Sequence, residues 1–375
     1  MEDLQTLRGQ LDEIDRQLVP LLEGRMDLVR RVGDYKRAHG LPVLDADRER
    51  DLLAEKRALL RSPQNAPAVT ALFETLMAVS RQSQRQSPPP LPVPPVRPPV
   101  SQPRVLYQGE PGAYAEEAAA RFFGEDSLRE NYPTWEDLFR ALDCRRGDYA
   151  VLPVENSSSG ILGGVYDLLS QYGGYLVGEV LLPVSHCLMA LPGAALADIR
   201  TVYSHEQGLL QSRVFLQAHP DWVQIPRLNT AESAKFVAET GDPTCAAIGS
   251  ARAAALYGLN ILQQPVSFNS CNATRFVVVS LQPELRPGSD KISVLLTLPH
   301  ESGSLYRLMQ VFALHGLSLL KLESRPIVGR NWEYRFFVDF SGCLTDDGMD
   351  GVLAELGEVC GELRILGNYP REVSP

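Results

Sequence analysis

Five residues at the start of an apolar run combine a hydroxyl group with a guanidinium group. The stretch Asn272 to Phe276 leads directly into residues 277–279, all valine, a pattern typical of a buried strand with polar residues at its mouth. The Arg275 side chain suits the binding of an anion, and the Thr274 hydroxyl suits an approach to a leaving oxygen. A capped edge strand without chemistry is the alternative that these five residues leave open.

Two more polar stretches follow apolar strands. The run Glu155 to Gly160 comes after the apolar segment 149–154 and precedes a predicted helix, so hydroxyls and backbone N–H groups gather where an anion is well received. A simple helix cap is the alternative. The run Ser204 to Gln207 contains His205, whose charge changes near neutral pH, although a lone histidine also suits a structural role.

The first 87 residues place cationic and amide side chains at helical spacing. Arg25 and Lys36 lie eleven residues apart, about three helical turns, and therefore face the same way. Arg8 points roughly 100° around the helix from Arg25, so it suits the pocket of a dimer partner. Two further sets share a helix face by their spacing, namely Asp45, Arg48 and Glu49, and Ser80 and Gln84. A solvated charged face is the alternative for Arg48 and Glu49 taken alone.

Helical periodicity predicts the elements that position these groups, over residues 4–37, 46–61 and 66–86. The first helix is longer than most globular helices, and a small bundle does not cover its apolar stripe, so dimerisation is expected. Pro20 and Gly24 lie inside this helix, where a proline costs about 3 kcal/mol and tends to kink the axis. The alignment of Arg8 with a partner's pocket depends on that kink.

The rest of the chain divides into a spacer and two α/β regions. Residues 88–103 are proline-rich and predict a stiff, extended spacer. Strands and helices then alternate, which indicates two α/β lobes around a cleft, divided near Pro183 and Gly258. Ala115 replaces the third glycine of a nucleotide-binding fingerprint, so no nicotinamide cofactor is expected. After a polar break at 282–290 the predicted order is βαββαβ, which is ferredoxin-like.

Composition limits the partners of the chain. With 375 residues, 44% of them apolar, it is long enough for two or three domains with buried cores. The net charge of −10 argues against nucleic acid and anionic membranes as partners. The N-terminus lacks the features of a signal peptide, so a cytoplasmic location is expected. The six scattered cysteines have no metal-ligand spacing, so neither a disulfide framework nor a metal site is expected.

The helical region resembles the all-helical chorismate mutases, specifically the mutase half of the bifunctional chorismate mutase/prephenate dehydratases. The segments Leu11 to Asp15 and Leu44 to Arg50 carry the resemblance. It implies that chorismate is bound by Arg25, Lys36, Asp45, Arg48, Glu49, Ser80 and Gln84, with Arg8 supplied by a second subunit. Lys36 and Gln84 are the residues implied at the ether oxygen, in a rearrangement that needs no acid, base or nucleophile.

The region 104–282 resembles prephenate dehydratase. The resemblance rests on Gly109 to Tyr114, Glu155 to Ser157, Ser204 to Gln207 and Asn272 to Phe276. It implies a two-lobed fold similar to periplasmic binding proteins, with Thr274 as the essential catalytic residue. The implied prephenate contacts are Asn156, Ser157, Ser204, Gln207, Thr230, Thr274, Arg275 and Phe276. Glu206 departs from the family, which usually has proline there, and adds a carboxylate near the expected anion site.

The region 283–375 resembles the amino-acid-sensing ACT domain of the same enzymes. The resemblance implies an allosteric phenylalanine site made of Gly303, Ser304, Leu305, Glu323, Ser324, Arg325 and Pro326. Ser304 and Tyr306 stand where alanine and valine are usual, which is expected to weaken binding of the effector.

The sequence therefore predicts a multidomain chain: an all-α helical mutase bundle (1–87), a proline-rich linker (88–103), a two-lobed α/β dehydratase (104–282) and an α+β ferredoxin-like ACT domain (283–375). We expect a bifunctional, cofactor-free enzyme that makes prephenate from chorismate and phenylpyruvate from prephenate, inhibited by L-phenylalanine and assembled as a homodimer or higher oligomer. A monofunctional dehydratase with a helical dimerisation module and a non-catalytic metabolite sensor are the alternatives. The sequence leaves open whether arogenate is also a substrate.

Overall fold

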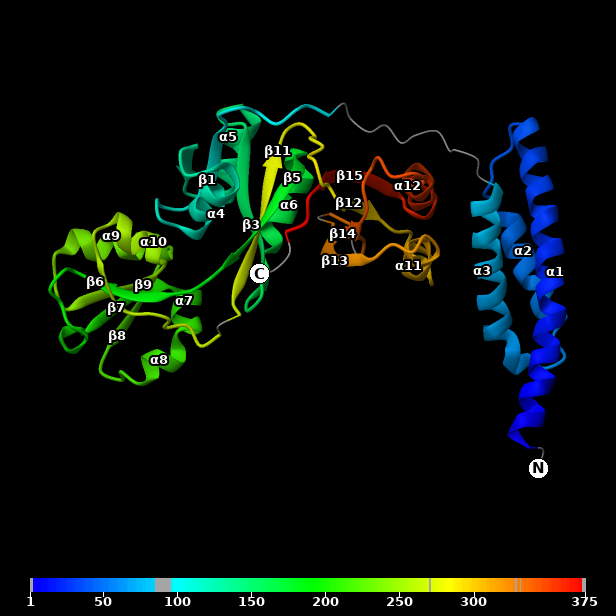
Figure 1. Ribbon diagram of the computed structural model, residues 1–375, viewed down its shortest axis with the longest axis horizontal. Coiled ribbons are helices and arrows are strands. Elements are labelled where there is room, and N and C mark those ends of the chain that lie inside the picture. The colour runs from blue at the N-terminus through cyan, green and yellow to red at the C-terminus, as the bar shows by residue number, and fades with distance from the viewer. Residues whose placement is uncertain (1–2, 85–95, 270, 328, 331, 373–375) are drawn as a thin grey trace. The chain divides into compact units, whose positions relative to one another are not determined.

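The computed structural model describes residues 3–84, 96–269, 271–327, 329, 330 and 332–372 (Figure 1). The chain forms two compact units, each interrupted in sequence. The first comprises Met1–Pro92, Pro299–Leu317 and Thr345–Gly361, and the second comprises Val93–Leu298, Ser318–Leu344 and Glu362–Pro375. None of the helices in the described ranges is long and apolar enough to cross a membrane.

The first unit contains the predicted N-terminal helices, now α1 (Leu4–Ala38), α2 (Ala46–Ala58) and α3 (Ala66–Gln84). Helix α1 continues through Pro20 as one α-helix. The 35 residues of α1 span about 52 Å, whereas the 19 residues of α3, which pack on it, span about 28 Å. Much of α1 therefore extends beyond α3 within the described residues.

Apolar side chains along α1 are consequently exposed. Leu7, Leu11, Ile14 and Leu18 are all more than two-fifths exposed. An apolar stripe of this kind usually packs against another surface, and dimerisation stays a prediction. The same unit contains α11 (Ser304–Leu314) and α12 (Met349–Val359), which pack on each other.

The second unit begins with an α/β lobe built on a mixed sheet in the strand order β2-β1-β3-β11-β5, with β4 paired to β3. Its strands are β1 (Arg104–Gln108), β2 (Leu128–Tyr132), β3 (Tyr149–Asn156), β4 (Gly160–Ile161), β5 (Tyr175–Pro183) and β11 (Ala273–Ser280). Its helices are α4 (Tyr114–Phe123), α5 (Trp135–Asp143) and α6 (Gly163–Tyr172). Because β1, β3 and β11 are covered on both faces, they read as near-continuous apolar runs.

A second lobe is inserted between β5 and β11, and its sheet has the order β10-β6-β9-β7-β8 (Figure 1). Its strands are β6 (Cys187–Ala190), β7 (Thr201–His205), β8 (Val223–Arg227), β9 (Cys245–Gly249) and β10 (Asn260–Gln263). Its helices are α7 (Glu206–Gln211), α8 (Arg213–Gln217), α9 (Thr230–Thr240) and α10 (Ala251–Leu256). The chain leaves the first lobe after Pro183, as predicted. It returns after β10, so the predicted division near Gly258 is wrong, because β10 still pairs with β6.

The C-terminal region has the predicted order βαββαβ, with an antiparallel sheet arranged β13-β14-β12-β15. Its strands are β12 (Lys291–Thr297), β13 (Leu319–Pro326), β14 (Tyr334–Ser341) and β15 (Glu362–Tyr369). This sheet packs on the first lobe, and Phe337, Leu366 and Tyr369 share a buried core with β3, β11 and α6. A Cβ atom on Gly367 would lie 1.9 Å from the Leu176 carbonyl oxygen, so only glycine allows β15 to approach β5 so closely.

The predicted spacer is only partly described by the structure, since its residues 88–95 lie outside the described ranges. Residues 96–103 contact the first lobe. The Arg97 backbone N–H donates to the Pro283 carbonyl at 3.0 Å, and its guanidinium donates to the Ser280 hydroxyl at 2.9 Å. The Val100 N–H donates to the Tyr149 hydroxyl at 2.9 Å. This part of the proline-rich stretch is thus fixed to the second unit.

Candidate active sites

A cleft of about 230 Å³ opens between the two α/β lobes of the second unit. The first lobe contributes the end of β1, the start of α4 and the facing residues of β3 and β11. The second lobe contributes the end of β7 and the starts of α7 and α9. Five of the predicted prephenate contacts line this cleft, namely Asn156, Gln207, Thr230, Thr274 and Phe276. Strand ends and helix starts thus meet at one place, as binding sites of α/β folds commonly do.

Thr274 and Asn156 face each other across β11 and β3 at the bottom of the cleft. They are directly paired in the strand register, and the Asn156 Nδ2 donates to the Thr274 Oγ1 at 2.9 Å. Both side chains are buried. Within the described residues the Thr274 hydroxyl accepts this bond and donates none, so its own hydrogen is available to an acceptor in the cleft. The pair is thus arranged as an oriented hydrogen-bond donor.

A chain of hydrogen bonds behind this pair fixes the orientation of Asn156. The Asn156 Nδ2 also donates to the Asn272 Oδ1 at 2.9 Å, and the Asn272 Nδ2 donates to the Gln211 Oε1 at 3.1 Å. The His186 Nε2 lies 2.9 Å from the same Gln211 oxygen, and the Tyr114 hydroxyl lies 3.0 Å from the His186 Nδ1. Burial lowers the pKa of His186, which keeps the ring neutral. A neutral ring that donates through Nε2 and accepts at Nδ1 satisfies every bond in this chain.

Gln211 and His186 were missed by the sequence-based prediction, although both line the cleft. Gln211 lies on α7, one turn beyond the predicted Gln207, so the helical spacing of the two glutamines could have identified it. His186 lies on the crossing segment between the lobes, in a stretch without a motif. Tyr114 and Asn272 were recognised as parts of motifs but not as site residues.

Neither lysine nor arginine is among the described residues that line the cleft. Its hydrogen-bond donors are hydroxyls, amides and the backbone N–H groups at the first turns of α4 and α9, which Tyr114 and Thr230 begin. The N-terminus of a helix carries unsatisfied N–H groups and a partial positive charge, so it receives carboxylates well. The cleft is therefore suited to an anion without a guanidinium contact.

Three predicted contacts do not line the cleft. The Ser204 hydroxyl is fully buried beneath α7 and donates to the Ile248 carbonyl at 2.8 Å. The Ser157 hydroxyl accepts from the Ala273 N–H at 2.9 Å and caps the start of β11. Glu206, the departure noted from the sequence, is exposed and does not line the cleft either.

Arg275 is the third misplaced contact, because successive side chains of a strand point to opposite faces of the sheet. Thr274 faces the cleft, so Arg275 faces away from it. The guanidinium makes ion pairs with Glu179 at 2.7 Å and Asp339 at 2.8 Å and is nearly buried. The expectation that Arg275 holds the anion beside Thr274 is therefore wrong.

In the first unit, Arg25, Ser80 and Gln84 meet where α1 contacts α3. The Arg25 Nη1 donates to the Ser80 Oγ at 2.6 Å, and burial lowers the pKa of Arg25. Gln84 packs so closely against Gly33 that a Cβ atom there would lie 3.1 Å from the Gln84 Cγ, and its buried Oε1 has no hydrogen-bond partner among the described residues. Lys36, one turn beyond Gly33, donates to the Val43 carbonyl at 2.7 Å.

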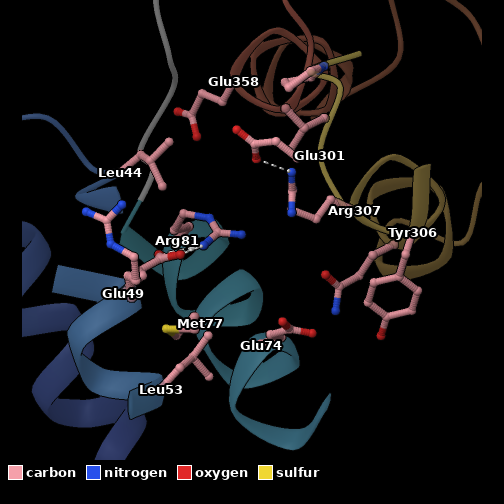
Figure 2. A pocket seen from close by; sticks show the side chains of 14 residues that line it. Leu44, Glu49, Leu53, Glu74, Met77, Arg81, Glu301, Tyr306, Arg307 and Glu358 are labelled. Carbon is pink, nitrogen blue, oxygen red and sulfur yellow. Dashed lines mark hydrogen bonds and ion pairs between the residues drawn. The ribbon is translucent and has the colours of Figure 1, made fainter. Parts of the chain in front are cut away.

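The remaining predicted residues of this unit are more open. The Asp45 side chain caps α2 by accepting from the Arg48 N–H at 3.0 Å. Glu49 and Arg81 face each other, as Figure 2 shows, and Arg81 donates to the Glu49 carboxylate at 2.5 and 2.7 Å. Arg81 was not predicted, although it lies beside Ser80. Arg8 and Arg48 are exposed. A single chain thus gathers only part of the predicted set.

The predicted effector motifs lie on α11 and β13. Gly303 has a positive φ of 81° and begins α11, which explains glycine at this position, and the Ser304 hydroxyl donates to the Glu301 carbonyl at 2.9 Å. Leu305 and Tyr306 are exposed by 43% and 50%. On β13, the Arg325 guanidinium donates to the Asp167 carboxylate of α6 at 2.7 and 3.2 Å, while Ser324 and Pro326 are exposed.

Comparison with known proteins gives matches along the whole chain. Residues 7–85 match the family model of chorismate mutase type II, and residues 105–284 match that of prephenate dehydratase. The chain is 32% identical to the bifunctional chorismate mutase/prephenate dehydratase of Aquifex aeolicus (strain VF5), covering 99% of both chains. It is 34% identical to the enzyme of the same description from Escherichia coli (strain K12), covering 98% of this chain and 96% of the relative.

A solved structure is similar to a large part of the chain. The prephenate dehydratase from Arthrobacter aurescens, determined in complex with L-Phe, superposes with a TM-score of 0.65 at 30% sequence identity. The match covers 72% of this chain and 90% of that chain.

Proposed function

The chain belongs to the bifunctional chorismate mutase/prephenate dehydratases, and on that premise we propose which of its residues carry each reaction and how the two are regulated. The protein is an enzyme that rearranges chorismate to prephenate and then converts prephenate to phenylpyruvate. The observation that carries the assignment of residues is the hydrogen bond from Asn156 to the Thr274 hydroxyl at the bottom of the cleft.

For the dehydratase reaction, Thr274 donates its free hydroxyl hydrogen to the C4 hydroxyl of prephenate. The ring carboxylate leaves as carbon dioxide, its electron pair enters the ring, and the C4 hydroxyl leaves as water after it has gained a proton. Aromatisation drives the step, so the enzyme needs only to stabilise the departing oxygen. A threonine hydroxyl is a weak acid, so the proton it gives is replaced from water that enters the cleft.

The remaining cleft residues orient prephenate. Asn156 holds the Thr274 hydroxyl, and Asn272 and Gln211 hold Asn156. Thr230, Gln207 and the first turns of α4 and α9 bind the two carboxylates. Phe276 packs against the ring.

For the mutase reaction, Arg25, Arg48 and Arg8 of a second subunit bind the carboxylates of chorismate, and Lys36 and Gln84 donate to the ether oxygen. Asp45, Glu49 and Ser80 complete the site, and the Arg81 pairing fixes Glu49. Such a rearrangement is accelerated by holding the dianion in its reactive conformation and by donors aimed at the developing charge. The exposed apolar stripe of α1 supports a dimer in which each first helix reaches its partner's site.

We further propose that residues 1–87 form the mutase domain, 104–282 the dehydratase domain and 283–375 an ACT domain that binds L-phenylalanine. The effector contacts are Gly303, Ser304, Leu305 and Glu323 to Pro326. The L-Phe complex of the Arthrobacter aurescens dehydratase supports this effector. The exposure of Leu305 and Ser324 supports a site that is completed by a second chain. Phenylalanine then lowers dehydratase activity by its preference for one arrangement of the subunits.

The test is to incubate the full chain with chorismate and, in a separate sample, with prephenate, and to follow chorismate, prephenate and phenylpyruvate over time. Transient prephenate followed by phenylpyruvate is expected. If prephenate is consumed but chorismate is not, the helical region is a dimerisation module only. If neither compound is consumed, the chain is a sensor rather than an enzyme. Titration with phenylalanine in the same assay, with calorimetry on the full chain, tests the proposed inhibition.

A further inference from the structure

The two residue pairs at the cleft end of β3 and β11 face opposite sides of the sheet. Thr274 is paired in register with Asn156, and Arg275 is paired with Glu155. Because side chains alternate along a strand, the first pair faces the cleft and the second pair faces away from it. Arg275 and Glu155, the neighbours of Thr274 and Asn156, therefore point away from the cleft. On that side of the first lobe lies the C-terminal sheet.

Arg275 is the centre of a buried polar cluster that joins the first lobe to that sheet. Its guanidinium makes an ion pair with Glu179 of β5 at 2.7 Å and with Asp339 of β14 at 2.8 Å, and it donates to the Tyr369 hydroxyl of β15 at 3.1 Å. Lys291 of β12 also contacts Glu179, at 2.6 Å. Burial opposes the charge of Arg275, but Tyr369, Asp339 and Glu179 raise its pKa above the ordinary value. Arg275 therefore stays charged and closely paired.

Glu155 makes the matching contact on β3. Its carboxylate accepts from the Lys321 Nζ of β13 at 2.7 Å, and the lysine also lies over the Tyr166 ring at 5.1 Å. The register between β3 and β11 shifts just after Arg275, so an irregularity of the ladder lies directly beside the reacting pair. A bulge at such a place makes the direction of neighbouring side chains sensitive to small movements of the strands.

We propose that Arg275 and Glu155 are positioning residues, which tie the Thr274 and Asn156 pair to the C-terminal sheet through Asp339 and Lys321. A movement of β13 and β14 then changes the alignment of the Thr274 hydroxyl with the departing oxygen. The inference rests on the proposed role of Thr274 in dehydration. It gives the C-terminal sheet a direct physical route to the reaction, without any contact between that sheet and the substrate.

One polar contact at the same junction is made to α6 instead of to β3 or β11. The Arg335 guanidinium of β14 donates to the Ser170 hydroxyl of α6 at 2.6 Å. Removal of Arg335 therefore disturbs the junction between the C-terminal sheet and the first lobe. It leaves the ion pairs of Arg275 and Glu155 in place. Arg335→Met is thus a matched control for Lys321→Met, since both replace a cation at this junction by the same apolar side chain.

The experiment compares Lys321→Met, Asp339→Asn and Arg335→Met in the full chain. Because a misplacement of about 1 Å costs on the order of a hundredfold in rate, the dehydratase kcat of the first two variants is expected to fall roughly ten- to a hundredfold, with KM within about twofold of the parent. Arg335→Met is expected to keep the parent kcat. The mutase activity of each variant, measured on the same sample, reports whether the chain is folded, and a thermal melt follows the stability of the second unit.

Asp339→Asn leaves Arg275 with an unbalanced buried charge, so Lys321→Met, which leaves the half-exposed Glu155, is the safer variant to fold. A double variant, Lys321→Met with Glu155→Gln, separates positioning from general destabilisation. If the two residues act as one tie, the double variant loses no more dehydratase kcat than Lys321→Met alone. A loss equal to the product of the single losses contradicts the tie.

Parent-like kcat in both Lys321→Met and Asp339→Asn overturns the inference, as does an equal loss in Arg335→Met. This result is distinct from a failure of the proposed function, which is tested by Thr274→Val. If Thr274→Val is inactive while Lys321→Met and Asp339→Asn are fully active, the proposed role of Thr274 is supported and the proposed positioning by Arg275 and Glu155 is wrong. Inhibition by phenylalanine adds a second readout: the tie variants are expected to bind the effector as the parent does and to be inhibited less. Unchanged inhibition contradicts the proposed route.

Discussion

The cleft of the second unit and the helical site of the first unit differ in how much of each a single chain builds. In the cleft, side chains from both lobes converge, and hydrogen bonds connect Thr274 to Tyr114 through four intervening residues. Nineteen residues from both lobes of one chain line this cleft. In the helical site, Arg25 contacts Ser80 and Gly33 contacts Gln84, but Arg8 and Arg48 are exposed.

The helical site is more open. A helix buries one stripe only, and α1 is almost twice as long as the helix that packs on it. Its function therefore depends on what covers the other half of α1. The difference leads us to expect that dehydration is a property of the folded chain, whereas the rearrangement is a property of the assembly.

The largest expected effect concerns Thr274 in the cleft of the second unit. Thr274→Val is nearly isosteric but removes the donor, so dehydratase turnover is expected to fall at least about a hundredfold. Production of prephenate from chorismate by the same sample should continue, because the two sites are separate. Parent-like formation of phenylpyruvate would remove Thr274 from the mechanism.

A mixing experiment tests the dependence of the helical site on assembly. Arg8→Ala and Gln84→Ala chains are each expected to lose mutase activity about a hundredfold as pure assemblies, because each removes a donor to developing or fixed charge. Co-expressed with two different tags and purified through both, the mixed dimer contains one intact site and should recover about half of the parent activity. Without recovery, Arg8 serves its own chain or no site. Dehydratase activity is the control and should not change.

The Gln84→Glu variant tests whether the Gln84 amide donates to the ether oxygen in the helical site. An amide donates a hydrogen bond at any pH, whereas a carboxyl must be protonated to do so. The parent mutase is expected to remain active at alkaline pH, and the variant to keep activity only toward acid. A variant profile that matches the parent across the neutral range would show that Gln84 does not contact the ether oxygen.

The predicted effector site, like the helical site, is exposed to solvent in a single chain. A substitution of Tyr306 tests whether phenylalanine binds there. The Tyr306 side chain is far larger than valine, so we expect it to narrow the proposed phenylalanine pocket, and Tyr306→Val is expected to tighten phenylalanine binding by roughly tenfold. Calorimetry and dehydratase assays on the full chain measure the change. If millimolar phenylalanine produces neither heat nor inhibition in the parent, the C-terminal region has a structural role only.

The smallest expected effect concerns His186, whose side chain is buried at the cleft. Its lowered pKa means that the unfolded chain takes up a proton at a higher pH than the folded chain. The stabilising contribution is therefore complete above the ordinary pKa of 6.5 and is lost as the pH falls below it. The free energy of unfolding should fall by at most about 1.4 kcal/mol per pH unit in this range. In His186→Gln this part of the pH dependence should disappear, and an unchanged pH dependence would exclude His186 as its source.

The sequence by itself determined the kinds and order of elements. Helical spacing placed Arg25, Ser80 and Gln84 on facing helices, and the polar mouth of an apolar strand singled out Thr274. The βαββαβ order of the C-terminal region was also readable, because periodicity, caps and turns are local properties of a chain.

Only the tertiary structure decided which side chains meet. Arg275 lies next to Thr274 in sequence, yet the alternation of a strand sends the two to opposite faces, and a second sheet far along the chain provides the partners of Arg275. His186 joins the cleft through its contact with Gln211, between two segments that no local pattern connects. Local propensity is set by neighbours in sequence, whereas the composition of a site is set by packing between distant segments, and the strand register that fixes it forms only when the sheets assemble.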